Sequence, residues 1–141
     1  MTEIKVEVVS FGYLHDPPPT ADVVLDLREL LHNPAADPTM REKTGVFPEV
    51  IEHVLETPGA VDLGEALLFM TRAIIHVRGL APYPIAASIA IGCSGGRHRS
   101  VVLANQLVHW LRQDGLGANV RHRDILKPVV RRKDRERGDR P

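Results

Sequence analysis

Cysteine, aromatic residues and long hydrophobic runs are all scarce in this 141-residue sequence. Cys93 is the only cysteine, aromatic residues make up 4% of the chain, and no apolar run approaches the length of a membrane span. A single cysteine excludes an intramolecular disulfide framework, argues against a structural zinc site and indicates a reducing compartment. A basic segment followed by an apolar run, the mark of a signal peptide, is also absent. We therefore expect a cytoplasmic protein without a metal, a cofactor or a membrane contact.

The chain carries no net charge, because 18 Lys and Arg residues balance 18 Asp and Glu residues. The two signs are unevenly distributed. Residues 121–141 hold nine basic and four acidic residues, a net charge of +5, which leaves −5 on residues 1–120. The composition predicts one globular domain over residues 1–124 and a basic, disordered tail over residues 125–141. Such a tail fits either a solubilising segment or a nucleic-acid contact.

Hydrophobic periodicity predicts an α/β fold. Strands are expected where apolar residues alternate or form short runs, over residues 4–12, 23–27, 85–92 and 118–123. Helices are expected where apolar residues recur every three or four positions, over residues 47–57, 62–79 and 100–114. Asp62 is the expected N-cap of the second helix, and Gly79 is its expected end. This order of elements predicts a mainly parallel sheet flanked by helices.

The most informative stretch joins the third strand to the third helix. An apolar run ends at Gly92, a glycine pair follows, then three basic residues, and Ser100 opens the helix. Glycines allow successive backbone N–H groups to point inward, and a helix N-terminus favours negative charge. The pattern predicts an anion-binding strand–turn–helix for a phosphate or carboxylate. Its ligand-binding residues would be Ser94, Gly95, Gly96, Arg97, His98, Arg99 and Ser100. The alternative is a glycine-rich connection with solvated basic side chains.

A cysteine-dependent phosphatase is a second interpretation of the same turn. Cys93 and Arg99 are separated by five residues and Ser100 follows, as in the C-x5-R-[ST] loop of those enzymes. There a thiolate attacks phosphorus, the arginine holds the phosphoryl oxygens and the hydroxyl stabilises the thiolate. Gly92, however, stands where those enzymes usually have histidine, and no general acid follows at an obvious position. Cys93 is equally typical of a small apolar residue at a strand end, so the sequence leaves open whether the protein is an enzyme.

Taken together, a set of short segments resembles the C-terminal domain of the RapZ family of RNase adaptor proteins. The resemblance keeps order and spacing over nearly the whole chain. Its segments are 9–13, 25–28, 33–34, 37–38, 41, 44–45, 91–101, 104, 106–107 and 121–123.

The resemblance implies a non-enzymatic regulatory domain that binds a phosphosugar, glucosamine 6-phosphate in the enterobacterial proteins. It also implies contact with RNA and an endoribonuclease, in a homo-oligomer. The family's phosphosugar pocket would use the turn, and the RNA contact would use Arg121, His122 and Arg123. Ala35-Ala36 replaces a common His-Trp pair and puts the identity of the sugar in doubt. Because the family's N-terminal nucleotide-binding domain has no counterpart here, its nucleotide hydrolysis is not expected of this chain.

Overall fold

A computed structural model describes residues 3–79 and 84–130. The elements follow one another in the order β1 (Ile4–Gly12), β2 (Val23–Asp26), the 3-10 turn η1 (Pro34–Ala36), α1 (Pro48–Leu55), α2 (Ala60–Arg78), β3 (Ala87–Cys93), α3 (Arg99–Gln113) and β4 (Gly117–His122). All strand pairs are parallel, and the sheet order is β2-β3-β1-β4. The predicted α/β fold with a mainly parallel sheet is confirmed. Among the described residues, no helix is long and apolar enough to span a membrane.

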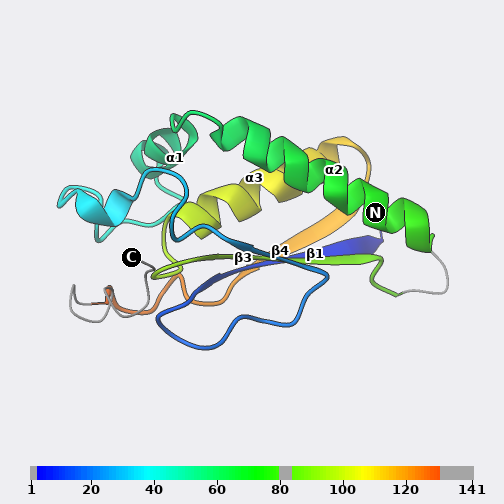
Figure 1. Ribbon diagram of the computed structural model, residues 1–141, viewed down its shortest axis with the longest axis horizontal. Helices are drawn as coiled ribbons and strands as arrows, with labels where there is room; N and C mark the ends of the chain where they lie inside the picture. Colours follow the sequence, from blue (N-terminus) through cyan, green and yellow to red (C-terminus); the bar gives the residue numbers. More distant parts are fainter. Residues whose placement is uncertain (1–2, 80–83, 131–141) are drawn as a thin grey trace.

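The helices lie on one face of the sheet only. Figure 1 shows α1, α2 and α3 on one side and the connection between β1 and β2 on the other. Parallel sheets usually have both faces covered. Here residues 19–21 of that connection line a hollow together with Glu7, Ser88 and Arg121, so this face is only partly covered.

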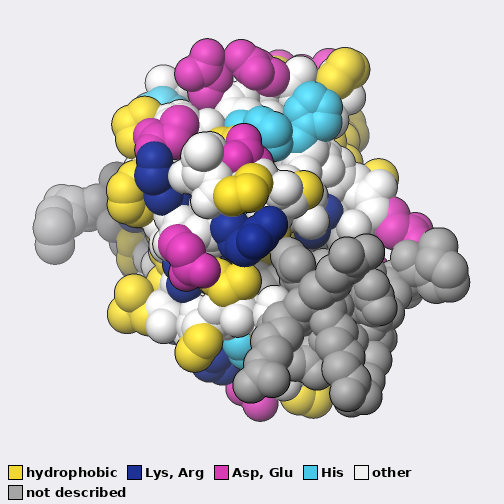
Figure 2. Space-filling model, turned by 90° about the vertical axis from the view of Figure 1, so that its left-hand side faces the viewer, with side chains coloured by type: hydrophobic (Ala, Val, Ile, Leu, Met, Phe, Trp, Pro, Cys, Tyr) yellow, Lys and Arg dark blue, Asp and Glu magenta, His cyan; other side chains and the backbone are white. Residues whose placement is uncertain are grey.

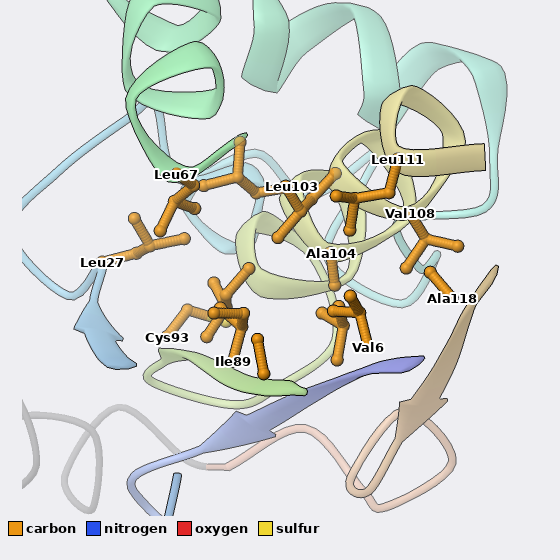
Figure 3. Close-up of a cluster of buried hydrophobic side chains, with 14 residues drawn as sticks. Val6, Leu27, Leu67, Ile89, Cys93, Leu103, Ala104, Val108, Leu111 and Ala118 are labelled. Carbon is orange, nitrogen blue, oxygen red and sulfur yellow. The ribbon is translucent and has the colours of Figure 1, made fainter. Parts of the chain in front are cut away.

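The core lies between the sheet and α3. Alternate strand residues such as Val6 and Ile89 point toward the helices and are fully buried. Leu103, Leu107 and Leu111, spaced four residues apart, form the buried stripe of α3 and belong to the same cluster. Figure 3 shows Leu103 and Leu111 on the side of α3 that faces the sheet. This packing fixes the N-terminus of α3 against the carboxyl ends of the central strands.

Helix starts differ from the sequence-based expectation. The prediction that Asp62 caps α2 is wrong, because α2 begins at Ala60 and its N-cap is Gly59, in the left-handed conformation at φ 89°. Asp62 instead lies in the first turn, where a carboxylate is favoured by the helix dipole. The end at Gly79 is confirmed, and α3 starts at Arg99, one residue before Ser100.

Candidate anion-binding site

The predicted turn, residues 94–98, lies where the topology places a ligand crevice. In the sheet order β2-β3-β1-β4, the connection that leaves β1 leads to the edge strand β2. The connection that leaves the adjacent strand β3 leads to the opposite edge strand, β4. Open α/β sheets bind ligands at the carboxyl ends of two such strands. Backbone hydrogen bonds from Tyr13 N to Cys93 O (2.9 Å) and from Leu14 N to Ser94 O (3.0 Å) hold the two strand ends together.

Glycines are required where this turn packs on the end of β1. A Cβ on Gly12 would lie 2.4 Å from the carbonyl carbon of Gly95. Gly96 adopts a positive φ of 75°, and a Cβ there would lie 2.6 Å from Gly12 N. Gly95 differs, because a Cβ would meet nothing within 4 Å. The backbone of residues 94–96 is therefore pressed against β1, while Gly95 borders open space.

Backbone donors gather at the start of α3. His98 is the N-cap of α3, but its side chain forms no capping hydrogen bond. Within the described part of the chain, the N–H groups of residues 95–99 donate no hydrogen bond. Uncapped N–H groups at a helix N-terminus, next to glycines, form a ready site for an anion.

The basic side chains of the turn, by contrast, hold the surrounding loops. Arg99 is 3% exposed, and its Nη1 donates to the carbonyl oxygens of Leu27 (2.9 Å), Arg28 (3.1 Å) and Leu30 (3.3 Å). The buried His98 ring has its Nε2 3.1 Å from the carbonyl oxygen of Arg41. Burial lowers the pKa of His98, so the ring is neutral near pH 7.

Arg97 connects the turn to two further loops. Its Nη1 donates to the carbonyl oxygens of Ile125 (3.3 Å) and Lys127 (2.9 Å), and its Nη2 donates to that of Glu42 (2.5 Å). Its Nε is buried without a hydrogen-bond partner in the described structure. Sequence reasoning placed these basic residues at the turn but missed their bonds to loop carbonyls, because a sequence pattern gives no direction for a long side chain.

The turn borders a pocket whose lining includes two residues that the sequence analysis did not single out, Val129 and Val130. Besides Cys93, Ser94, Gly95, Arg97, His98 and Arg99, it is lined by Asn33, Ala35, Val129 and Val130. Asn33 precedes the 3-10 turn and accepts a hydrogen bond from Ala35 N. The Asn-Pro pair was a usable signal for this loop, whereas nothing in the sequence marked the two valines.

Cys93 belongs to the hydrophobic core. Its side chain is 3% exposed and packs in the same cluster as Ile91 and Leu103. Its Sγ lies 3.1 Å from Ser100 Oγ, within hydrogen-bond distance of that hydroxyl group. The phosphatase alternative with Cys93, Arg99 and Ser100 finds no support, since the Nη1 of Arg99 is bonded to three backbone carbonyls. Among the residues described, no group of three or more His, Cys, Asp or Glu side chains could hold a metal ion.

The predicted nucleic-acid residues at the end of β4 have three different environments. His122 is bonded at both ring nitrogens: Ser10 Oγ lies 2.6 Å from Nδ1 and Asn105 Oδ1 lies 2.9 Å from Nε2. Arg123 donates to the carbonyl oxygens of Asp16 and Pro17 and to Asp124. The Arg121 side chain is exposed and has no hydrogen bond or ion pair within the described ranges. The basic residues 131–140 lie outside the described residues.

Asp124 is a buried carboxylate that the sequence analysis missed. It is 0% exposed and accepts hydrogen bonds from Gly12 N (2.7 Å), from Arg123 Nη2 (2.9 Å) and from Lys127 Nζ (2.6 Å). Burial alone would raise the pKa of Asp124, but these hydrogen bonds outweigh it and lower the pKa to about 2. The ionised carboxylate ties the ends of β1 and β4 to residue 127, beside the turn.

Figure 2 shows the side of the molecule at which the strands end. In the part that is described, Lys and Arg side chains lie among acidic, histidine and apolar side chains.

Fold and site together define a parallel α/β domain with a glycine-containing turn and uncapped backbone N–H groups at the N-terminus of α3. The chain belongs to the RapZ C-terminal domain family, whose model matches residues 4–126.

Three similar proteins are consistent with this assignment. The chain is 39% identical over 136 residues to the nucleotide-binding protein STH186 of Symbiobacterium thermophilum, covering 93% of this chain and 43% of that protein. It is 43% identical over 128 residues to a nucleotide-binding protein of Syntrophomonas wolfei, covering 87% of this chain and 41% of that protein. A nucleotide-binding protein of Thermobifida fusca is 38% identical over 126 residues, which covers 88% of this chain and 42% of the relative. The chain thus spans about two fifths of the length of these relatives.

Proposed function

We propose that this protein is a regulatory domain that binds a phosphorylated small molecule at the turn and performs no chemistry on it. The observation that carries the proposal is the cluster of backbone N–H groups of residues 95–99, which have no acceptor in the described structure and lie at the uncapped start of α3. Phosphate oxygens are the acceptors that such a cluster favours. A phosphosugar similar to glucosamine 6-phosphate is the ligand that the family resemblance suggests.

The side chains would act on the ligand in different ways. Arg99 lines the pocket and uses Nη1 for backbone carbonyls, which leaves its other guanidinium N–H groups to face a phosphate. Neutral His98 would contribute no charge and would instead keep residue 41 beside the turn. Because the relatives are named nucleotide-binding proteins, a nucleotide phosphate is a competing ligand for the same donors.

Calorimetric titration tests the proposal with glucosamine 6-phosphate, unphosphorylated glucosamine, inorganic phosphate and ATP. Gly95→Ala is the informative variant, because the added methyl group stands on the pocket wall and meets no protein atom within 4 Å. We expect binding of the phosphosugar but not of glucosamine, and weaker binding by Gly95→Ala with a loss of less than about 1 kcal/mol in the free energy of unfolding. An absence of binding for every phosphorylated compound would remove the proposal, and preference for ATP would change the ligand class.

RNA contact is a second proposal, now limited to a smaller set of residues. Of the predicted triplet, only Arg121 is free of partners within the described residues, and it points to the face of the sheet opposite the helices. We expect Arg121→Glu to reduce salt-sensitive retention of RNA on a filter. Arg112→Glu, on α3, is the control. Retention equal in the two variants would exclude Arg121 from an RNA contact.

Self-association is supported by an unusual helix face, which we call the α2 stripe: Ala66, Phe69, Met70, Ala73 and Val77. Their spacing places them on one side of α2, and Phe69, Met70 and Val77 are 73%, 47% and 84% exposed. Monomeric proteins seldom expose a continuous apolar strip of this kind. We propose that the stripe packs against the same stripe of a second copy.

Charge along α2 favours an antiparallel arrangement of the two copies. Asp62 and Glu65 lie in its first half, and Arg72, His76 and Arg78 lie in its second half. A two-fold axis near Phe69 and Met70 would set the acidic half of one α2 helix beside the basic half of the other. It would also place Ala66 of one copy near Ala73 of the other, where small side chains allow close packing. Isologous contacts of this type are the commonest in homo-oligomers.

A further inference from the structure

The segment that follows β4, residues 125–130, lies against the anion-binding turn. We call it the strap. Val129 and Val130 line the same pocket as Ser94, Gly95 and Arg99. Within the strap, Leu126 is 92% exposed and points away from this contact. One side of the strap thus faces the candidate ligand position with apolar groups.

The strap is held there by charged groups of the site itself. Arg97 donates from Nη1 to the carbonyl oxygens of Ile125 (3.3 Å) and Lys127 (2.9 Å). Lys127 Nζ bonds to Asp124 (2.6 Å) and to Asp16 (3.1 Å), and Lys127 N donates to the carbonyl oxygen of Asp124 (3.1 Å). The strap is therefore attached to the turn through Arg97 and to β4 through Asp124.

These contacts engage Arg97, a cation of the pocket that would attract a phosphate. The two Nη atoms of Arg97 donate to three carbonyl oxygens, and two of these oxygens belong to the strap. The Nε of Arg97 is buried without a hydrogen-bond partner in the described structure. A buried donor without an acceptor is unfavourable, and a charged donor more so. Arg97 would gain a better acceptor in a phosphate than in a neutral carbonyl oxygen.

We propose that the strap is an autoinhibitory element, which covers the anion site and is released when a phosphorylated ligand draws Arg97 to itself. The proposal rests on the proposed function of the turn. Ligand and strap compete for Arg97 and for the space beside Gly95.

Two variants test the proposal in the full chain with inorganic phosphate as the probe. Val129→Ala/Val130→Ala removes apolar contacts of the strap with the pocket, and Leu126→Ala is the matched control in the same segment. A buried methylene corresponds to about a fourfold change in an equilibrium constant. We expect the double variant to bind phosphate roughly fivefold or more tightly than the native chain, and Leu126→Ala to bind within about twofold of it.

Hydrogen–deuterium exchange gives an independent measurement. Saturation with phosphate should speed exchange of the amides in residues 125–130, including Lys127 N–H, and slow that of residues 95–99. Equal or weaker phosphate binding by the double valine variant, or slower exchange of the strap, overturns the autoinhibitory role while the anion site stands. If neither the native chain nor the double variant binds phosphate or glucosamine 6-phosphate, the proposed function itself fails, and this inference fails with it.

Discussion

At the scale of single residues, Arg99 shows how one side chain can serve both the fold and the site. Its guanidinium is almost fully buried and bonded to three carbonyl oxygens at the end of β2, yet it borders the pocket. Loss of binding in an Arg99→Ala variant would therefore have two explanations, which is why Gly95→Ala is the better test of the ligand site.

Arg99→Ala should be strongly destabilising. The substitution leaves three backbone carbonyls without their donor and opens a cavity, and we expect a loss of roughly 3 kcal/mol or more in the free energy of unfolding. Urea denaturation monitored by circular dichroism measures it. Arg112→Ala is the matched control, because Arg112 is exposed and donates one hydrogen bond, to the carbonyl oxygen of Ala118. Similar small losses for both variants would contradict the structural role of Arg99.

The buried His98 should make stability depend on pH. Burial lowers its pKa below the unfolded value of about 6.5, so below that pH the unfolded chain binds a proton that the folded chain excludes. Stability from His98 is therefore complete above about pH 6.5 and is lost as the pH falls toward its lowered folded value.

His98→Gln keeps a hydrogen-bond donor and removes this titration. We expect the native chain to lose more unfolding free energy than His98→Gln between pH 7.5 and 5.5, measured by urea titration at each pH. His122, whose pKa is also lowered by burial, is present in both proteins and cancels in the comparison. Parallel pH profiles would show that His98 does not titrate in this way.

At the scale of elements, the contact between β1 and the turn depends on glycine at some positions and not at others. Gly12→Ala should cost about 2–3 kcal/mol, because its methyl group would lie 2.4 Å from the backbone of Gly95 and overpacking forces a backbone shift. Gly95→Ala should cost less than about 1 kcal/mol, since its methyl group meets open space. Thermal unfolding of the two single variants measures the difference. An equal loss in both would mean that the turn is free to move away from β1.

Elements and topology were largely accessible from the sequence, whereas the side-chain arrangement of the site was not. Alternation in β1 and the four-residue spacing of α3 report burial directly, and both elements were predicted within one or two residues. The N-cap of α2 was missed because Gly59, not a polar side chain, begins that helix. The directions of Arg97 and Arg99 depend on loops distant in sequence, at residues 27–30, 42 and 125–127, and local pattern cannot give them.

At the scale of the whole molecule, the helices cover only one face of the sheet and α2 leaves an apolar stripe uncovered. α2 buries one side against α3 and exposes Phe69 and Val77 on another, so this helix carries apolar residues on two of its sides. A helix of this kind is expected to be buried on both sides. Within the described residues, no element of the fold covers the side of α2 that carries Phe69 and Val77.

Self-association through the α2 stripe should be broken by one charge. Phe69→Glu places a carboxylate at the proposed two-fold axis, where it would face the same carboxylate of the second copy and lose its hydration. We expect a dimer by sedimentation equilibrium for the native chain and at least about a tenfold weaker dimer for Phe69→Glu, as for a central interface residue. Val46→Glu, at a position 55% exposed outside α2, changes the same chemistry elsewhere and should leave the dimer intact. If the native chain sediments as a monomer, the stripe has another occupant, and if both variants dissociate equally, the contact lies outside α2.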